Sequence, residues 1–580
     1  METDGRIEEI ELVLHRIERK YANDPLFGEV CAVAVLCLLE RSGNGGVAFP
    51  DLNSALDACG VGELARKAME EALGGHWEEY RALAGRFAED DLVDLLETRY
   101  VRMMREKVQS SPSMDALSLE LLAIRPGESC LDLCAGAGFF VNEAWLSMSR
   151  LAGRGENAIL AGIEPNKDLA CQAAVLSAIR GTGGKIEVAD CFDPRHLRGQ
   201  YDKVHCSAPF GLNVRRLDFA NVRKCIGQAF PDFPPITLTS ADWLFAARAV
   251  AALKEGGKAV VVMPRAALGS AQSAPYRRHF VSKRWIESVI AFPEGAYPGT
   301  SVPVAVVTFA KDSPRIKLHE LREYAHAPND PTVFNPVPIV RDHALLFHYG
   351  DVVTKTTQEI LARDAELDPA FHLGVPSAYG SHTPLADLCE TIFRGAVLPK
   401  SVLDKLFPAS GGEGRIAYLS PKNISDGLLD DDLPLLREMP PGAESAMANT
   451  GDVVITRSGP AFKVAVVERG PCVADGNLVV CRCRHGAANP WVLAAFLASE
   501  EGAQWLRRMS SGLQHTLSLK KLARIPVPDV SGEAGARMAA AMFRRLARVR
   551  ELRRELKENL SGIGSVFAEA MDNGGTGDGH

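Results

Sequence analysis

Apolar residues recur at helical spacing near the start of the chain. Ile7, Ile10, Val13 and Ile17 follow one another by three or four residues, and runs rich in Ala, Leu and Glu come after them. This period places the apolar side chains on one face of a helix. It predicts a helical N-terminal domain over residues 1–105.

From residue 106 to residue 315 the pattern changes to short apolar runs separated by amphipathic segments. The segments 168–180 and 241–254 have helical periodicity, whereas the runs between such segments have the length of strands. Alternation of strands with helices over this length predicts an α/β, Rossmann-like domain with a doubly wound, mostly parallel sheet. The expected strands are 129–134, 158–163, 185–188, 203–206, 258–263, 286–291 and 302–309.

Two further segments precede the end of the chain. Residues 316–380 contain many Pro, Gly and His, and we expect them to form a connector. From residue 381 to residue 530, short strand-like runs are broken by Gly, Pro, Asn and Asp. This texture predicts a second, α+β domain that is rich in strands.

A stripe of apolar residues near the end of the chain predicts a long helix over residues 531–565. Its members are spaced by three or four positions, as in a coiled coil, so we expect the helix to pack on another helix. The glycine-rich residues 566–580 are expected to be a disordered tail. The stripe consists of Met538, Met542, Leu546, Val549, Leu552, Leu556 and Leu560.

The composition is that of an ordinary globular chain, with 580 residues, 46% of them hydrophobic and 24% charged. No apolar run reaches about 18 residues, so we expect no membrane span, and the acidic N-terminus is unlike a signal peptide. The 13 cysteines lack zinc-like spacing. We expect the reduced thiols of a cytoplasmic protein, without metal, rather than disulfides or zinc sites.

Charge is unevenly distributed along the chain. The net charge of −8 does not by itself indicate binding to nucleic acid. The beginning of the chain is rich in Glu and Asp, however, and its end is rich in Arg. For the arginines of the terminal helix, contact with phosphates and a solvated helix face are equally consistent with the sequence.

A glycine turn follows the first expected strand, where residues 132–140 are DLCAGAGFF. Gly136 and Gly138 allow the backbone to approach a ligand closely. NAD is the alternative ligand, but a dinucleotide fingerprint would have a third glycine at the position of Val141. Asp132, which precedes the glycines, favours S-adenosylmethionine because a carboxylate can meet the amino group of its methionine part.

Two further acids strengthen this prediction. Glu164 ends the second expected strand, where a carboxylate can bind both ribose hydroxyls, and Asp190 ends the third, where it can accept a hydrogen bond from an adenine amine. Phe192 is expected to lie against the adenine ring. The predicted cofactor-binding residues are Asp132, Ala135, Gly136, Gly138, Phe140, Glu164, Asp190 and Phe192.

The tetrapeptide Ser207-Ala208-Pro209-Phe210 follows the fourth expected strand. A side-chain oxygen from Ser207 and the carbonyl of Ala208 can accept hydrogen bonds from an aromatic amine, which favours the tetrahedral nitrogen that methyl transfer needs. Phe210 can stack on the base, once the base has left its duplex. The alternative is a tight turn after a strand, because Ser, Pro and Gly favour turns.

These residues resemble the modification subunits of type I restriction-modification systems, which are N6-adenine DNA methyltransferases. Asp132, Gly136, Gly138 and Phe140 fill the fixed positions of the family's Asp-Pro-x-x-Gly-x-Gly-x-Phe segment. Ser111-Pro112 is similar to its Thr-Pro element at the cofactor pocket, and residues 240–264 and 292–303 are similar to segments that follow its catalytic motif. The resemblance implies an S-adenosylmethionine-dependent methyltransferase catalytic domain over residues 106–315.

The departure from the family lies in the tetrapeptide, which is normally Asn-Pro-Pro-Phe or Asn-Pro-Pro-Tyr. Ser207 in the first place is common in related N4-cytosine methyltransferases, so adenine N6 is the expected target and cytosine the alternative. Ala208 replaces a proline with a rigid φ angle. The resemblance therefore leaves open a second possibility, a catalytically impaired DNA-binding component that keeps the fold.

Residues 381–530 resemble a single target-recognition domain of the specificity subunit of the same systems, and residues 531–565 resemble its spacer helix. The similar segments include 384–395, 418–425 and 451–459. The resemblance implies sequence-specific binding of double-stranded DNA, with a homodimer through the terminal helix and a restriction subunit on a separate chain as possible partners. Methylation of a protein amide would leave this domain unexplained. The predicted DNA-contacting residues are Lys422, Asn423, Arg457 and Lys463.

Overall fold

The computed structural model of the chain divides into two compact units, Met1–Leu373 and Gly374–His580. Among the helices that the structure describes, none is long and apolar enough to cross a membrane. The described residues are 51–58, 61–73, 112–152, 160–179, 185–195, 200–293, 296–297, 302–321, 326–327, 330–334, 350–373, 381–407, 415–459, 461–511, 516–529 and 532–573, with Cys31, Val33, Val35 and Leu36.

Part of the predicted helical N-terminal domain is described. It contains α3 (Leu52–Ala58) and α4 (Glu63–Leu73). Helix α4 packs on α9 (Lys167–Ile179), which belongs to the α/β part of the same unit. Most of residues 1–105 lie outside the described residues, so the prediction of a complete helical domain stays a prediction.

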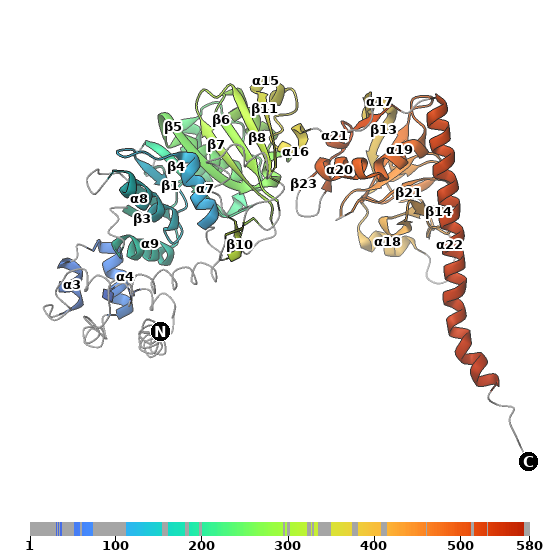
Figure 1. Cartoon of the computed structure of the whole chain (residues 1–580), viewed down its shortest axis with the longest axis horizontal. Coiled ribbons are helices and arrows are strands. Elements are labelled where there is room, and N and C mark those ends of the chain that lie inside the picture. Colours follow the sequence, from blue (N-terminus) through green and yellow to red (C-terminus); the bar gives the residue numbers. More distant parts are fainter. Residues whose placement is uncertain are drawn as a thin grey trace, which may run out of the picture. The chain divides into compact units, whose positions relative to one another are not determined.

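A nine-stranded sheet forms the centre of the first unit (Figure 1). From edge to edge the strand order is β11-β8-β6-β7-β5-β4-β1-β2-β3. Strands β3, β2, β1, β4 and β5 run parallel, whereas β7 is antiparallel to both of its neighbours. The predicted mostly parallel α/β sheet is confirmed. The predicted strands are β1 (Cys130–Asp132), β2 (Leu160–Glu164), β3 (Lys185–Val188), β4 (Tyr201–Ser207), β5 (Leu253–Pro264), β6 (Ile286–Ala291) and β7 (Val304–Ala310).

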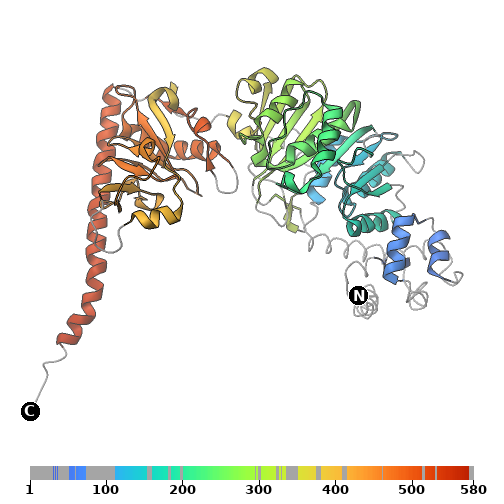
Figure 2. The same cartoon turned by 180° about the vertical axis from the view of Figure 1, so that it is seen from behind.

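Helices cover both faces of this sheet, as Figures 1 and 2 show from opposite sides. One apolar core joins the sheet to α10 (Phe219–Ala229), α11 (Asp242–Ala251) and α12 (Ala274–Ser282). A second core joins the other face to α7 (Pro112–Leu122) and α8 (Phe139–Ala152). Because side chains alternate along a strand, each buried strand contributes to both cores.

Residues 316–380, predicted to be a connector with some secondary structure, contribute strands to the sheet of the first unit. Strand β8 (Arg315–Leu321) is parallel to β6, and β11 (Gly350–Thr356) closes the sheet as an edge strand. Exposed and buried residues alternate in β8, so its sequence lacks the continuous apolar run that marks a central strand. The boundary between the two units lies at Leu373.

The second unit contains two small four-stranded sheets, with the orders β13-β22-β19-β20 and β17-β14-β21-β18. The strands of the first are β13 (Cys389–Arg394), β22 (Leu478–Cys483), β19 (Val453–Thr456) and β20 (Val464–Val466). Those of the second are β17 (Leu435–Leu436), β14 (Ile416–Leu419), β21 (Cys472–Ala474) and β18 (Met447–Ala448). The short strands expected for residues 381–530 are present there. Helix α22 (Gly532–Asn573) runs beside these sheets and continues beyond them (Figure 1). It includes residues 566–573 of the segment predicted to be a disordered tail, where Ala568, Glu569, Ala570 and Met571 favour a helix. Residues 574–580 lie outside the described residues.

Helix α22 is fixed to its own domain by ion pairs. Arg550 pairs with Glu468, and Arg553 pairs with Asp426. Leu546 is buried and lies 3.4 Å from the position that a β-carbon on Gly427 would take. These contacts explain part of the arginine content of the terminal helix, because Arg550 and Arg553 are neither simply solvated nor free for phosphates.

Candidate active site

The glycine turn lies between β1 and α8, at the carboxyl end of the sheet. Gly136 has a φ of +52° and Gly138 a φ of +84°, values that favour glycine. A β-carbon on Gly138 would lie 2.6 Å from the β-carbon of Ala173 in α9. Gly138 is therefore needed for the close approach of α9 to the turn, in addition to any role beside a ligand.

Glu164 and Asp190 lie after the two neighbouring parallel strands β2 and β3. The carboxylate of Glu164 accepts hydrogen bonds from the amides of Gly136, at 3.0 Å, and Asn166, at 2.9 Å. Burial is the main cause that raises the pKa of Glu164. Asp190 Oδ1 accepts a hydrogen bond from the amide of Phe192 at 2.9 Å. Glu164 thus connects the glycine turn to the end of β2.

Four of the predicted cofactor residues have side chains that are buried by the protein itself. Asp132 and Phe140 are 2% exposed, Ala135 is 6% exposed and Phe192 is 0% exposed. The ring of Phe192 packs on that of Phe245, with centroids 5.1 Å apart. These side chains support the turn from the core. The expected contacts of Asp132 with a methionine amino group and of Phe192 with an adenine ring are not available in this structure.

The tetrapeptide begins at the last residue of β4. Ser207 and Phe210 are half-buried, Pro209 is exposed, and Ala208 is 9% exposed. The peptide is fixed from behind by Asp242 in the first turn of α11, since the amide of Gly211 donates to Asp242 Oδ1 at 3.2 Å. Burial raises the pKa of Asp242. Ser207 and Phe210 are therefore partly accessible on a loop that Asp242 stabilises, and the ring of Phe210 packs against the second core.

Tyr297 is a residue of this site to which the sequence assigned no role. It is 7% exposed, its ring meets that of Phe210 edge to face with centroids 4.9 Å apart, and its hydroxyl shares a hydrogen bond with the side chain of Ser207. Burial and the charge of Asp115 raise the pKa of Tyr297 to about 12. The phenol is therefore neutral near pH 7 and able to donate to the serine oxygen.

The sheet brings the glycine turn and the tetrapeptide together. Strands β4, β1, β2 and β3 are consecutive neighbours and parallel, with Asp132 opposite both Gly162 and His205. Parallel strands end at the same edge, which is where open α/β sheets bind ligands. The carboxylates of Glu164 and Asp190 suit the diol and the amine of a nucleoside, so the donor set fits the nucleoside part of S-adenosylmethionine.

The four predicted DNA-contacting residues lie near the β19–β20 hairpin of the second unit. The ammonium of Lys463 donates to the carbonyl of Pro421, beside Lys422, at 3.2 Å. Burial and the charge of Arg394 lower the pKa of Arg457, so Arg394, whose Nε donates to the carbonyl of Gly476 at 2.6 Å, lies near Arg457. Asn423, in contrast, uses its side-chain oxygen on Ser420 and its amide on Asp430, so its side chain stabilises a turn.

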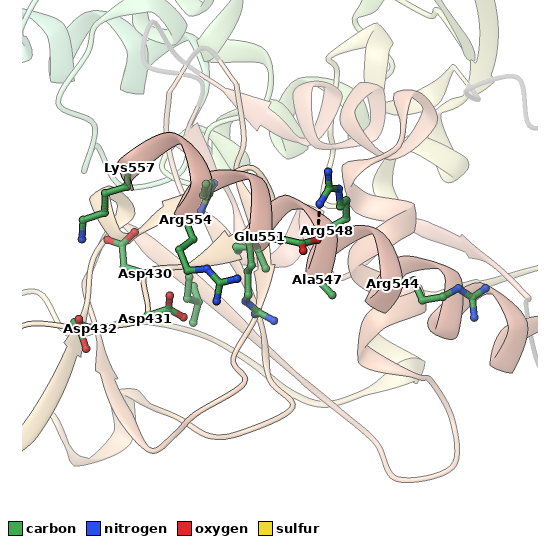
Figure 3. A pocket seen from close by; sticks show the side chains of 13 residues that line it. Asp430, Asp431, Asp432, Arg544, Ala547, Arg548, Glu551, Arg554 and Lys557 are labelled. Carbon is green, nitrogen blue, oxygen red and sulfur yellow. Dashed lines mark hydrogen bonds and ion pairs between the residues drawn. The ribbon is translucent and has the colours of Figure 1, made fainter. Parts of the chain in front are cut away.

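A separate cavity of about 930 Å³ lies between α22 and the loop after β16 (Leu428–Leu429). Arg554 and Lys557 lie on the side of the helix that faces Asp430 and Asp431, while Arg544 lies farther along the helix (Figure 3). Side chains of both signs line this cavity. The four carboxylates offset part of the charge of the six cations, which weakens the attraction for a phosphate backbone.

Comparison with known proteins agrees with this geometry. Residues 111–325 match the family model of N-6 DNA methylases. No curated protein matches the chain. Similar solved structures include the methyltransferase subunit of a type I restriction-modification system from Streptococcus thermophilus, with 17% identity over 60% of this chain and 80% of that chain, and a TM-score of 0.44.

Two further solved structures show the range of the similarity. The M protein of the type I restriction enzyme EcoKI is 13% identical over 62% of this chain and 89% of that chain, with a TM-score of 0.36. The type IIG restriction endonuclease BpuSI is 13% identical over 91% of this chain and 74% of that chain, with a TM-score of 0.49. The match over residues 111–325 identifies this part of the chain as an N-6 DNA methylase domain, which supports S-adenosylmethionine-dependent methylation of adenine in DNA.

Proposed function

We propose that this chain combines modification with sequence recognition, as part of a restriction-modification or defence system. The first unit would methylate adenine and the second would select the DNA sequence. The observation that carries the proposal is the presence, on one chain with a methylase domain, of a separate strand-rich unit whose cations gather around one hairpin, with Lys463 beside Lys422 and Arg457 beside Arg394.

The tetrapeptide would hold the target base. An adenine flipped out of the duplex would place its ring on Phe210. Its amine hydrogens would be accepted by Ser207 Oγ and by the carbonyl of Ala208, which draws the nitrogen lone pair out of the ring system. Tyr297, donating to Ser207, would leave a lone pair of the serine oxygen directed to the amine.

S-adenosylmethionine, when bound, supplies an electrophilic methyl group on a sulfonium, so no strong base is needed to start the reaction. Glu164 would hold the ribose hydroxyls of this methyl donor, and Asp190 would accept from its adenine amine. Glu164 accepts from backbone amides with both carboxylate oxygens and Asp190 with one, which fixes the direction of each carboxylate before the ligand arrives. The turn at Gly136 would bring the backbone close to the ligand.

The cations of the second unit would contact phosphates and position the recognition loops. Lysine and arginine contacts to phosphate fix the register of a protein on DNA, and contacts to base edges add sequence preference. Each lost phosphate contact should lower the slope of log K against log salt by about one. Lys422, Lys463 and Arg457 are the residues for which we expect this behaviour.

A second copy of the chain is the partner that we propose for α22. Leu552, Leu556 and Leu560 are 47%, 59% and 58% exposed and share one face of the helix. Pairing of two such faces would bury them and join two recognition domains, so that a dimer would read two half-sites. A restriction subunit on a separate chain would complete the system.

The experiment that tests the proposed function combines methyl transfer with binding. Purified full-length protein is incubated with labelled S-adenosylmethionine and a library of duplexes, and the labelled duplexes are sequenced. We expect label on duplexes that share one motif. The double variant Arg457→Gln/Lys463→Gln should methylate less, with a salt slope smaller by about two. Arg469→Gln, an exposed arginine of the same unit, is the matched control.

Three outcomes separate the alternatives. Label on duplexes without a shared motif would refute the selective role of the second unit while leaving the methylase intact. Sequence-specific DNA binding without label on any duplex would favour the impaired component that the substitution at Ala208 suggests. Label on cytosine rather than adenine would contradict the assigned base.

A further inference from the structure

A buried charged cluster lies directly behind the site, and neither the glycine turn nor the tetrapeptide explains it. His205 Nδ1 is 3.2 Å from Asp132 Oδ1, and His205 Nε2 is 3.8 Å from Asp115 Oδ1. The three side chains are only 2–3% exposed. The imidazole also stacks on Phe140, with centroids 3.8 Å apart and ring planes at 13°. The cluster therefore joins three elements, β1, β4 and α7, under the first residues of α8.

The charges of this cluster require a protonated imidazole. With His205 charged, the three groups carry a net charge of −1. With His205 neutral, two carboxylates would face a neutral ring in a site closed to water, which is strongly unfavourable. The contact between His205 Nδ1 and Asp132 Oδ1 is within hydrogen-bond distance but poorly aligned, so ionic attraction is its main component.

The cluster touches both halves of the proposed active site. Asp132 Oδ1 also accepts from the amide of Cys134, at 3.2 Å, at the start of the glycine turn. His205 is two residues before Ser207 on β4, and its carbonyl accepts from the amide of Leu133 at 3.0 Å. The charge of Asp115 acts on Tyr297, which is hydrogen-bonded to Ser207.

We propose that His205, in its protonated form, is a positioning residue that holds the glycine turn and the catalytic serine in register by neutralising Asp132 and Asp115. The proposal rests on the proposed binding of the methyl donor at the glycine turn. His205 touches neither ligand. It acts through Asp132 on the turn, and through Asp115 and Tyr297 on the hydroxyl of Ser207.

The pH dependence has a definite direction. Burial alone would lower the pKa of His205, but the charges of Asp132 and Asp115 outweigh it and raise the pKa above its usual value. The stabilisation is therefore complete at low pH and is lost as the pH rises through the raised pKa. The titratable groups that face His205 are Asp132 on β1 and Asp115 on α7. Tyr297 lies near Asp115, and Glu164, Cys130 and Cys134 lie near Asp132, while Phe140 on α8 and Val260 on β5 do not titrate.

Charge-balanced variants of the full-length protein test the proposal. His205→Gln leaves two uncompensated carboxylates, and we expect S-adenosylmethionine to bind at least about tenfold more weakly by calorimetry. His205→Gln/Asp115→Asn restores the net charge of −1 and should recover most of that affinity. Asp115→Asn alone is the control for the second substitution. A steric role of the imidazole would predict that the double variant binds as weakly as the single one.

The unsubstituted protein gives a second test that does not depend on the folding of variants. Its affinity for S-adenosylmethionine, and its thermal stability without that ligand, should fall together as pH rises from about 6 to about 9. The double variant should lack this fall. A flat profile of the unsubstituted protein, or no rescue in the double variant, would overturn the proposal. Weak methyl transfer with normal ligand binding would instead count against the proposed function alone.

Discussion

At the scale of single residues, the first position of the tetrapeptide determines how the target amine is held. An asparagine would present a fixed carbonyl oxygen, whereas the hydroxyl of Ser207 rotates and can turn its proton toward the amine. Tyr297 compensates for this freedom, because its hydrogen bond with Ser207 fixes the rotor. Where an asparagine would offer one fixed carbonyl oxygen, this site has the hydroxyl groups of Ser207 and Tyr297.

Removal of the serine oxygen should therefore affect the chemical step more than binding. We expect Ser207→Ala to lower the rate of methyl transfer about 10²–10³-fold, as the loss of one preorganised polar contact does in other enzymes. Affinity for S-adenosylmethionine should remain unchanged. Ser207→Asn, which restores an acceptor oxygen, is the matched control and should stay active. Equal single-turnover rates for Ser207→Ala and the unsubstituted protein would show that Ser207 does not hold the amine.

Candidate residues can be predicted from sequence where they follow a recognisable strand, whereas residues whose contacts come from distant parts of the chain cannot. Glu164 and Ser207 each end a strand, which is visible in the pattern of apolar runs. His205, in contrast, looks like any polar residue in a strand, and only its pairing with Asp115, ninety positions earlier, gives it a function. The sequence around Phe192 does not show whether its ring faces the core or a ligand. In the structure the ring is buried in the core.

At the scale of elements, the glycine turn depends on packing as much as on ligand approach. Gly138→Ala would add a β-carbon 2.6 Å from Ala173 in a residue with a φ of +84°. Gly127 has a φ of +83° with open space around it, so Gly127→Ala measures the backbone cost alone, about 1–2 kcal/mol. We expect Gly138→Ala to lose more free energy of unfolding than Gly127→Ala in urea titrations. Equal losses of unfolding free energy for the two variants would mean that α9 can move away from the added β-carbon at no cost.

A partly buried cluster of charged side chains around Arg265 connects β8 to the rest of the first unit. Arg265 pairs with Glu320 of β8, at 2.6 Å, and with Asp368, at 2.8 Å, and its side chain is 19% exposed. Arg265→Ala would leave two carboxylates without a counterion, at an expected cost of about 3–5 kcal/mol in the free energy of unfolding. Lys311→Ala breaks the surface pair with Glu255 and should cost less than about 1 kcal/mol. A similar small cost for both variants in denaturant titrations would contradict this account.

The same strands show why element prediction failed between residues 316 and 380. A central strand is buried on both faces and is visible as an apolar run, as in β7, where six of the seven residues are buried. Strand β8 has polar residues at alternate positions, and its place in the sheet is determined by the partners β6 and β11. A strand whose position is determined by its neighbours in the sheet is difficult to recognise from a short stretch of sequence.

At the scale of the whole molecule, the chain contains a methylase unit and a second unit with its own cores and long helix. The exposed leucine face of α22 makes the oligomeric state a direct test of the proposed partner. We expect a dimer by light scattering, and a monomer for the triple variant Leu552→Ser/Leu556→Ser/Leu560→Ser. The variant Arg544→Ser on the same helix should remain dimeric. A monomeric unsubstituted protein, measured with and without DNA, would exclude this dimer.

The central claim is that this chain methylates adenine at a chosen DNA sequence. Base-resolution mapping of modified bases in the genomic DNA of a host that carries the gene tests it most directly, with a host that carries Ser207→Ala as the matched control. The account predicts N6-methyladenine at nearly every copy of one motif, and its loss or strong reduction in the Ser207→Ala host. An absence of motif-linked N6-methyladenine, or its persistence at full level in the Ser207→Ala host, would contradict the account.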